Sequence, residues 1–467
     1  MKSDKKTAMR FSKAVLQKIA GGIMLVIIIT YLAFHALGLF QYKAALGSFM
    51  QAFSTSKSEP DYSCPAVQGD VSDKARPHFS LNRDLDARMI SSFGKNLITN
   101  ADFSQKIKGG QATKIVGFTP ASYGVEARYS VMSDDSNYLS AELTATKEAG
   151  GDAKWAPDRI ASSQLLSPRA IIYRDAYRSK SESYLILETT DSSGKSSFTE
   201  IARLAPSEQW RDYAIQYIVP SSAKSFRIFH SLFAVGRLDI KNISLQSLTG
   251  ADLRSPIISV SFDDGWQSVY QNALPILDKY SVRTTQYIIA DEISKPEYMT
   301  EAELKKLMKD GHEIGGHSLR HCDLTTLAGY DLRYDIQNSK KILSKTFGPI
   351  KGFAHPFGSY NDSTVEELKK EFSYIRSTDV GFNTRFFDKQ NIQVQNIYPD
   401  TKLSEVEAMV SQAVNEKLWL VFVYHRAEPT GKYGINLEEL DKQIATIAKS
   451  GAKVLPISAA IEEINSQ

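Results

Sequence analysis

Two adjacent aspartates, Asp263 and Asp264, follow the apolar run Ile257–Phe262. Such a run is typical of a strand in a parallel sheet, and ligands bind at the carboxyl ends of these strands. Further along the chain, His317 and His321 stand four residues apart, a spacing that places two imidazoles on one helical face. Asp264 and the two histidines would give a divalent cation three ligands and leave positions open for water and substrate. With Asp263 free to act as a base, the pattern predicts metal-assisted hydrolysis.

Each half of this pattern has an ordinary explanation when it stands alone. Asp-Asp-Gly after a strand is often only a turn, because Asp and Gly are preferred turn residues, and histidine pairs at this spacing are often simply solvated. A third feature favours the functional interpretation. His425 ends another apolar run, Leu418–Tyr424, at a position where barrel enzymes also place their chemistry. The three features together predict an active site.

The segment Ser255–Glu463 resembles the NodB-homology polysaccharide deacetylases, carbohydrate esterase family 4. Its Ser-Phe-Asp-Asp-Gly at Ser261–Gly265 is similar to the family's first motif, Thr-Phe-Asp-Asp-Gly. His317–His321 matches the His-Ser/Thr-x-x-His motif, and Phe353–Gly358 is similar to the Arg-x-Pro-Tyr/Phe-Gly segment. Leu420–His425 resembles the late motif that ends in a catalytic histidine.

The resemblance implies a role for each matching residue. Asp263 is expected to be the general base and His425 the general acid. Asp264, His317 and His321 are expected to bind the metal, with Zn²⁺ favoured and Co²⁺, Ni²⁺ or Fe²⁺ as alternatives.

The third matching segment is expected to contact the substrate. The backbone N–H of Phe357 would help to bind the oxyanion, with Pro356 and His355 beside it. His355 is also the next candidate for the acid if His425 does not serve. The Phe-Ala-x-Pro-Phe/Tyr-Gly form of this segment resembles the branch that acts on poly-N-acetylglucosamine polymers.

Two family features are missing from this sequence. The arginine that usually braces the base falls on Ala354, so we expect the position of Asp263 to depend on the metal and on backbone donors. An Asp and Trp pair that holds the acid histidine is not recognisable near Ile375–Phe382. Asp379 and Asp400 are the nearest candidates for orienting the acid.

The implied activity is removal of N-acetyl groups from a glycan that contains N-acetylglucosamine, in a cell wall or exopolysaccharide. The metal would polarise the carbonyl, and a histidine can protonate the leaving amine near neutral pH. Two alternatives stay open: an O-acetyl polysaccharide esterase, which needs the same attack by water, and a non-catalytic glycan-binding protein.

The N-terminal segment predicts a membrane anchor. Six basic residues against Asp4 give a charge of +5 over residues 1–18, so the remaining chain carries about −2 of the net +3 and shows no basic excess for nucleic acid. Ile19–Phe40 is 22 residues without Asp, Glu, Lys or Arg and spans about 33 Å as a helix, enough for a bilayer core. The basic head would stay cytoplasmic and everything after Gln41 would lie outside. Cleavage as a signal peptide, near Ala45–Gly47, is the alternative.

Residues 41–94 are predicted to be a linker, and residues 95–249 a β-sandwich of the jelly-roll type. Short alternating runs separated by turn clusters are typical of such sandwiches, and the segment resembles carbohydrate-binding modules. Four aromatic residues could stack on sugar rings, although a place in the core is favoured for most of them: Trp155, Tyr173, Tyr177 and Trp210.

Residues 252–467 are predicted to form the deacetylase domain, a distorted (β/α)₇ barrel, because strands and helices alternate there. Thr300 and Glu303 form the capping box of a helix that extends to Asp310. A disulfide between the two cysteines, Cys64 and Cys322, is possible, and Cys322 as a metal ligand is a minor alternative. The predicted strands are Ile257–Phe262, Thr284–Ala290, Glu313–Gly315, Gly352–Ala354, Tyr374–Ser377, Leu418–Tyr424 and Lys453–Leu455.

Overall fold

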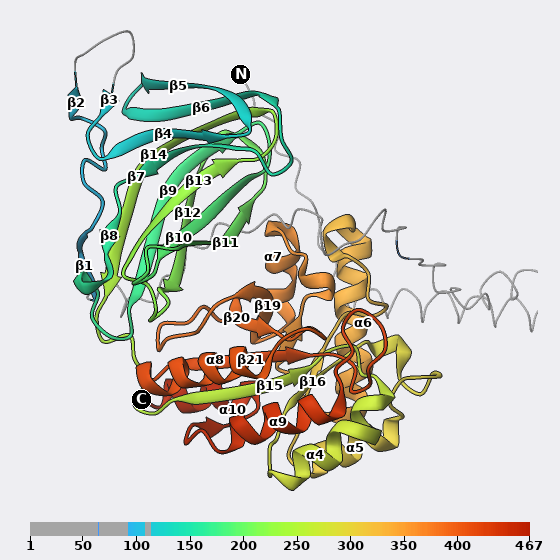
Figure 1. Ribbon diagram of the computed structural model, residues 1–467. Coiled ribbons are helices and arrows are strands. Elements are labelled where there is room, and N and C mark those ends of the chain that lie inside the picture. Colours follow the sequence, from blue (N-terminus) through green and yellow to red (C-terminus); the bar gives the residue numbers. More distant parts are fainter. Residues whose placement is uncertain (1–63, 65–91, 108–113) are drawn as a thin grey trace, which may run out of the picture. The chain divides into compact units, whose positions relative to one another are not determined.

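The computed structural model describes Cys64, residues 92–107 and residues 114–467 (Figure 1). The predicted basic head, the anchor at 19–40 and most of the 41–94 linker lie outside the described residues. Among the helices of the described residues, none is long and apolar enough to cross a membrane.

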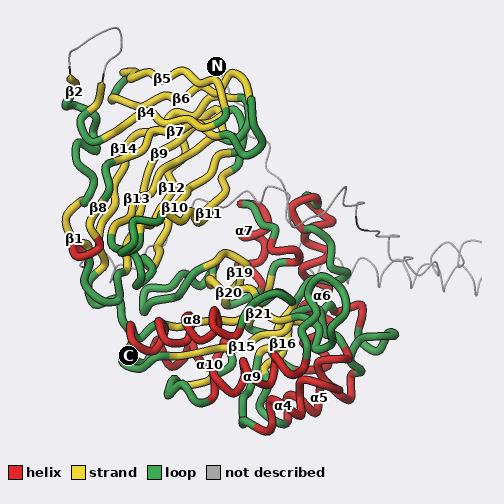
Figure 2. Tube along the Cα trace, viewed as in Figure 1, coloured by secondary structure: helices red, strands yellow, loops and turns green. Residues whose placement is uncertain are grey.

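The segment predicted as a sandwich forms two antiparallel sheets (Figure 2). The first has six strands, in the order β12 (Ser207–Ile218), β9 (Ala170–Ser179), β14 (Gly236–Leu248), β6 (Asn137–Thr146) and β5 (Val125–Ser133), with β1 (Phe93–Asn96) paired to β14. The second has eight, in the order β11 (Ser196–Leu204), β10 (Ser183–Thr190), β13 (Ser225–Leu232), β7 (Asp152–Pro157), β4 (Phe118–Tyr123), β3 (Lys114–Ile115) and β2 (Lys106–Ile107), with β8 (Ile160–Ala161) paired to β13.

One hydrophobic core fills the space between these two sheets, because alternate side chains of each strand point inward. Trp155, Tyr173 and Tyr177 belong to this core and are 1–3% exposed, so they are not available for stacking on sugars. Trp210 is half-buried, and two cations, Arg178 and Lys241, lie over its ring.

Three polar side chains in the sandwich core have the contacts of a Ser-His-Asp nucleophile. Ser183 Oγ lies 2.8 Å from His230 Nε2, and His230 Nδ1 lies 3.0 Å from Asp175 Oδ2. Burial excludes catalysis by this group, because the exposed fraction is 0% for Ser183 and 1% for His230, and a substrate carbonyl would have to reach Ser183 Oγ. The network satisfies polar groups that the core encloses.

The C-terminal part is a parallel barrel. Its strands follow the order β16 (Thr285–Ile288), β17 (Glu313–Gly316), β18 (Gly352–Ala354), β19 (Tyr374–Val380), β20 (Ile392–Asn396), β21 (Trp419–Tyr424), β15 (Ile257–Phe262) and β22 (Lys453–Val454). Pairing of β15 with β16 closes a ring of seven strands, and β22 adds to β15 outside that ring. The predicted seven-stranded barrel is present, and six of its strands are where the sequence placed them.

The seventh strand of the ring was not predicted. The sequence assigned it to Lys453–Leu455, whereas the structure places β20 in that position. Strand β20 reads Ile-Gln-Val-Gln-Asn, which lacks the continuous apolar run expected of a barrel strand. Its glutamines are nevertheless buried, and the Gln395 side chain donates to the carbonyl of Gly381 at 3.0 Å, so hydrogen bonding offsets the cost of enclosing an amide.

Helices surround the strands of the barrel (Figure 1). Thr300 caps α5 through the predicted capping box with Glu303. The α-helices are α4 (Leu274–Lys279), α5 (Glu301–Lys309), α6 (Gly329–Phe347), α7 (Asp362–Glu371), α8 (Leu403–Glu416), α9 (Leu437–Ala448) and α10 (Ile457–Asn465). Short helical turns are η3 (Ser162–Gln164), η4 (Val269–Ala273), η5 (Ala290–Glu292), η6 (Leu324–Thr326) and η7 (Pro356–Gly358).

Candidate metal centre and active site

The predicted ligands meet at the carboxyl ends of β15 and β17. Asp264 follows β15 with a positive φ of 75°, and His317 directly follows β17. The histidine pair is not on a helix, contrary to the sequence prediction. Ser318 and His321 have φ of 67° and 58°, so the chain bends into a loop. The loop still brings the imidazoles of His317 and His321 together, with ring centroids 4.9 Å apart.

The three side chains are arranged as a metal site requires. Asp264 Oδ1 lies 3.3 Å from His317 Nε2 and 3.2 Å from His321 Nε2, and the three ligand atoms lie within 4.8 Å of one another. Asp264 Oδ1 is buried and makes no hydrogen bond with the described residues, as expected of an atom that faces a cation. His317 Nδ1 lies 2.8 Å from the carbonyl of Ala354, which places the proton on Nδ1 and leaves Nε2 free to coordinate. The residues therefore fit a divalent metal ion.

The electrostatics of Asp264 agree with this fit. Burial raises the pKa of its carboxyl, but the adjacent His317 and His321 outweigh burial and hold the pKa well below its usual range. The carboxylate stays ionised, as a metal ligand must be.

Asp263 has the arginine partner that the sequence seemed to lack. The side chain of Arg376 forms an ion pair with the Asp263 carboxylate, and both residues are buried, with exposed fractions of 0% and 2%. The expectation that Asp263 depends only on the metal and on backbone donors is therefore wrong. Arg376 lies on β19 beside Ala354 of β18 in register, so the guanidinium comes from the strand next to the one that carries it in the family pattern.

A sequence signal for this arginine exists. Strand β19 begins Tyr-Ile-Arg-Ser, and a charged residue inside a buried strand needs a partner of opposite charge. Position along the chain points to Ala354 for the brace, whereas the register of β18 and β19 points to Arg376.

His425 lies directly after β21, and its Nε2 is 4.0 Å from Asp263 Oδ2. Burial lowers its pKa below the ordinary value, although Asp264 and Asp263 act in the opposite direction. The ring of Tyr433 stacks on the imidazole, with centroids 4.7 Å apart and planes at 22°.

Asp379 and Asp400 were the candidates for orienting the acid histidine. His425 Nδ1 is buried without a hydrogen-bond partner among the described residues. Asp379 accepts hydrogen bonds from Tyr360 at 2.6 Å and from Asn391 at 3.0 Å, and Asp400 is exposed. The acid-orienting role of these two aspartates stays a prediction.

The predicted substrate segment forms η7, directly after β18. Phe357 has a φ of 57°, and its ring packs edge-on against His321 with centroids 4.3 Å apart, so this residue lies next to the metal ligands. Pro356, the preceding residue, is buried. His355 is 1% exposed and stacks on Tyr360, and burial, followed by the charge of Arg376, lowers its pKa to about 3. A histidine that stays neutral is a poor reserve acid.

His355 should make stability depend on pH. The folded-state pKa of about 3 lies below the unfolded value of about 6.5, so the unfolded chain binds a proton that the folded chain refuses between these values. The contribution of neutral His355 to the free energy of unfolding is fully present above about pH 6.5. It falls on acidification by up to about 1.4 kcal/mol per pH unit. His355→Phe, which keeps an aromatic ring on Tyr360, should reduce this slope between pH 6 and 4. Urea unfolding at each pH measures it, and an unchanged slope would contradict the assignment.

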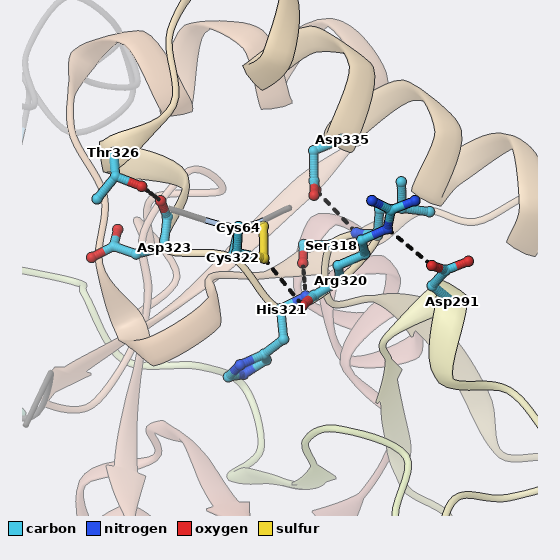
Figure 3. The surroundings of a disulfide bond; sticks show 10 residues. Cys64, Asp291, Ser318, Arg320, His321, Cys322, Asp323, Thr326 and Asp335 are labelled. Carbon is cyan, nitrogen blue, oxygen red and sulfur yellow. Dashed lines mark hydrogen bonds and ion pairs between the residues drawn. A yellow bond between two sulfur atoms is a disulfide. The ribbon is translucent and has the colours of Figure 1, made fainter. Parts of the chain in front are cut away.

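A disulfide and several hydrogen bonds hold the loop of the ligand histidines (Figure 3). Cys322, which follows His321, is bonded to Cys64, so the open question about this pair is answered and Cys322 is not a metal ligand. Asp335 of α6 accepts the N–H of Leu319 at 3.0 Å, and Ser318 Oγ accepts the N–H of His321 at 2.7 Å.

Part of the barrel is similar in sequence to known proteins. Residues 250–371 match the polysaccharide deacetylase family. A putative polysaccharide deacetylase, YxkH, of Bacillus subtilis is 29% identical over 114 residues, which are 24% of this chain and 41% of that protein. Peptidoglycan-N-acetylglucosamine deacetylase of Bacillus cereus is 30% identical over 115 residues, 24% of this chain and 52% of the relative.

A third relative is the poly-β-1,6-N-acetyl-D-glucosamine N-deacetylase of Staphylococcus aureus, 29% identical over 126 residues, 24% of this chain and 43% of that protein. The matching regions thus cover about half of each relative or less. The segment that matches the family contains Asp263, Asp264 and both ligand histidines, whereas Arg376 and His425 lie beyond it.

Proposed function

Since residues 250–371 match the polysaccharide deacetylase family, we propose that this protein is a metal-dependent N-deacetylase of a glycan that contains N-acetylglucosamine. The observation that supports it most is the arrangement around Asp263. This carboxylate is paired with Arg376, adjoins the ligand Asp264, and lies 4.0 Å from His425. A base, an acid and a cation site thus converge at one end of the barrel.

The residues of the chain have separate tasks in this reaction. A divalent ion held by Asp264, His317 and His321 would polarise the acetyl carbonyl and lower the pKa of water towards about 7. Asp263 takes the proton of the attacking water, and Arg376 fixes the position of that carboxylate. His425 donates a proton to the leaving amine, and the backbone N–H of Phe357 supports the oxyanion.

The polymer is proposed from the relatives. Two of them are named for peptidoglycan N-acetylglucosamine and for poly-β-1,6-N-acetyl-D-glucosamine, which share the N-acetylglucosamine unit. The proposed cation is Zn²⁺, with Co²⁺, Ni²⁺ or Fe²⁺ as substitutes, because mixed nitrogen and oxygen ligands suit these ions better than Ca²⁺ or Mg²⁺.

Release of acetate tests the proposal. Chelator-treated protein is incubated with chitooligosaccharides, poly-β-1,6-N-acetylglucosamine, peptidoglycan and acetylated xylan, with and without Zn²⁺. We expect metal-dependent release from the N-acetylated polymers. Release from xylan alone would mean an O-acetyl esterase, and binding without release from any polymer would mean a non-catalytic glycan-binding protein.

His425→Ala should affect two substrates differently. An amine leaves only when it is protonated, whereas an activated aryl alcohol leaves without a proton. The variant should therefore lose about a hundredfold or more on an N-acetylated oligosaccharide and much less on an aryl acetate. Steady-state kinetics on both substrates measure the difference. Equal losses would show that His425 does not act as the acid.

We also propose that Ile19–Phe40 anchors the protein, with the barrel outside the cytoplasmic membrane. The uncharged span after a basic head supports this, and so does the Cys64–Cys322 disulfide, because disulfides persist in oxidising compartments. Protease added to intact spheroplasts should digest the barrel. Full protection of the barrel would overturn the proposal.

A further inference from the structure

A tryptophan bonds to the carboxylate of the metal site. Trp266 Nε1 donates a hydrogen bond to Asp264 Oδ2 at 2.8 Å. The other oxygen, Oδ1, is the one that lies 3.3 and 3.2 Å from the ligand nitrogens of His317 and His321. The two oxygens of Asp264 are therefore divided: one is held by the indole, and the other faces the cation site.

The indole ring of Trp266 is itself held from two elements. Tyr298 stacks on it, with centroids 4.5 Å apart and planes at 20°, and the two residues also form a backbone bridge. The guanidinium of Arg426 lies 3.4 Å from the ring centroid. Arg426 in turn is paired with Glu428 at 3.0 Å and Glu297 at 3.3 Å. With neighbours at this range, the indole cannot rotate away from Asp264 without displacing one of them.

Arg426 and Trp266 lie on two adjacent loops at the end of the barrel. Arg426 directly follows His425 at the end of β21, whereas Trp266 follows Gly265 at the end of β15. Strands β15 and β21 are neighbours, and Phe262 pairs with Tyr424. The contact between Trp266 and Arg426 thus joins the loop that carries Asp264 to the loop that carries His425.

We propose that Trp266 is a positioning residue that orients the Asp264 carboxylate towards the cation, and that Arg426 holds Trp266 in that position. This inference rests on the proposed function for the presence of a metal. A carboxylate can rotate and present either oxygen or both. A hydrogen bond to Oδ2 keeps Oδ1 directed at the histidines, so less orientational freedom is lost when the ion binds. Removal of such an outer partner of a metal ligand typically costs about 10–100-fold in metal affinity or activity.

Trp266→Phe isolates the hydrogen bond, because phenylalanine keeps an aromatic ring between Tyr298 and Arg426 but has no N–H. Zn²⁺ affinity is measured on chelator-treated full-length protein by competition with a coloured chelator. We expect binding weaker by about 10–100-fold, with thermal unfolding of the metal-free protein close to that of the unsubstituted chain. At saturating Zn²⁺, kcat should recover to within a few-fold of the unsubstituted protein, since the variant changes the affinity of the site for Zn²⁺ and leaves Asp263 and His425 in place.

Two further variants separate this role from a general effect of losing a tryptophan. Trp210→Phe is the matched control, because Trp210 is also half-buried and also lies against cationic side chains, Arg178 and Lys241, but belongs to the sandwich. The Zn²⁺ affinity of this variant should not change. Arg426→Gln removes the cation from the Trp266 ring and keeps the indole N–H, so it should weaken Zn²⁺ binding less than Trp266→Phe. This variant also serves if Trp266→Phe proves unstable.

The outcomes are distinct. Zn²⁺ affinity within twofold of the unsubstituted protein in both Trp266→Phe and Arg426→Gln would overturn the inference and leave the proposed function intact. Equal loss in Trp210→Phe would also overturn it. If the unsubstituted protein itself binds no stoichiometric metal, the proposed function fails first, and this inference fails with it.

Discussion

Asp263→Asn should bind its divalent ion and yet lose turnover by at least about a hundredfold, because removal of a general base typically costs that much or more. The proposed ligands Asp264, His317 and His321 are unchanged in this variant, so elemental analysis should still find one ion per chain. Acetate release under single-turnover conditions measures the loss. Turnover within tenfold of the unsubstituted protein would show that Asp263 is not the base.

The design of this experiment must allow for Arg376. Asparagine leaves that buried guanidinium without its counter-charge, and breaking a buried pair typically costs about 3–5 kcal/mol of stability. The double variant Asp263→Asn, Arg376→Met removes both charges and should recover much of that stability without recovering turnover. Comparison of the single and double variants by urea unfolding therefore separates loss of the base from loss of the fold.

Arg376→Met should also destabilise the protein strongly. It leaves Asp263 buried and unpaired, and we expect a loss of about 3–5 kcal/mol, with turnover reduced because the base is no longer held. Urea unfolding measures the loss of stability, and acetate release under single-turnover conditions measures the loss of turnover.

The neighbouring strand provides a rescue for the same change. Ala354 lies beside Arg376 in register, and it occupies the position at which the family motif carries its arginine. The double variant Ala354→Arg, Arg376→Ala should regain part of the activity that Arg376→Ala loses. If Arg376→Met keeps both full turnover and full stability, the ion pair does not support the base.

The residues that the sequence identified have a local signature. Strands β15 and β21 are continuous apolar runs, and Asp263, Asp264 and His425 follow them directly. The apolar pattern and the position of the polar residues were therefore sufficient to identify these three as candidates. The histidine pair was identified by its spacing and by its resemblance to the family's His-Ser/Thr-x-x-His motif. Its loop conformation was not predicted, because positive φ at Ser318 and His321 has no signature comparable to a glycine.

The features that the sequence analysis missed depend on neighbours in space. Arg376 is the partner of Asp263 although 113 residues separate them, and only the register of β18 and β19 brings its side chain to that carboxylate. Strand β20 has buried glutamines whose partners lie on other segments. Trp266 directly follows the Ser261–Gly265 motif in the sequence. Its hydrogen bond to Asp264 depends on the direction of the side chain, which the sequence does not specify.

The Cys64–Cys322 disulfide closes a covalent ring that contains every strand of the sandwich, because the two cysteines are 258 residues apart. Tension on the chain before Cys64 therefore passes to the loop of His321 and bypasses the sandwich. A single proteolytic cut within the ring leaves the two pieces joined until a reductant is added.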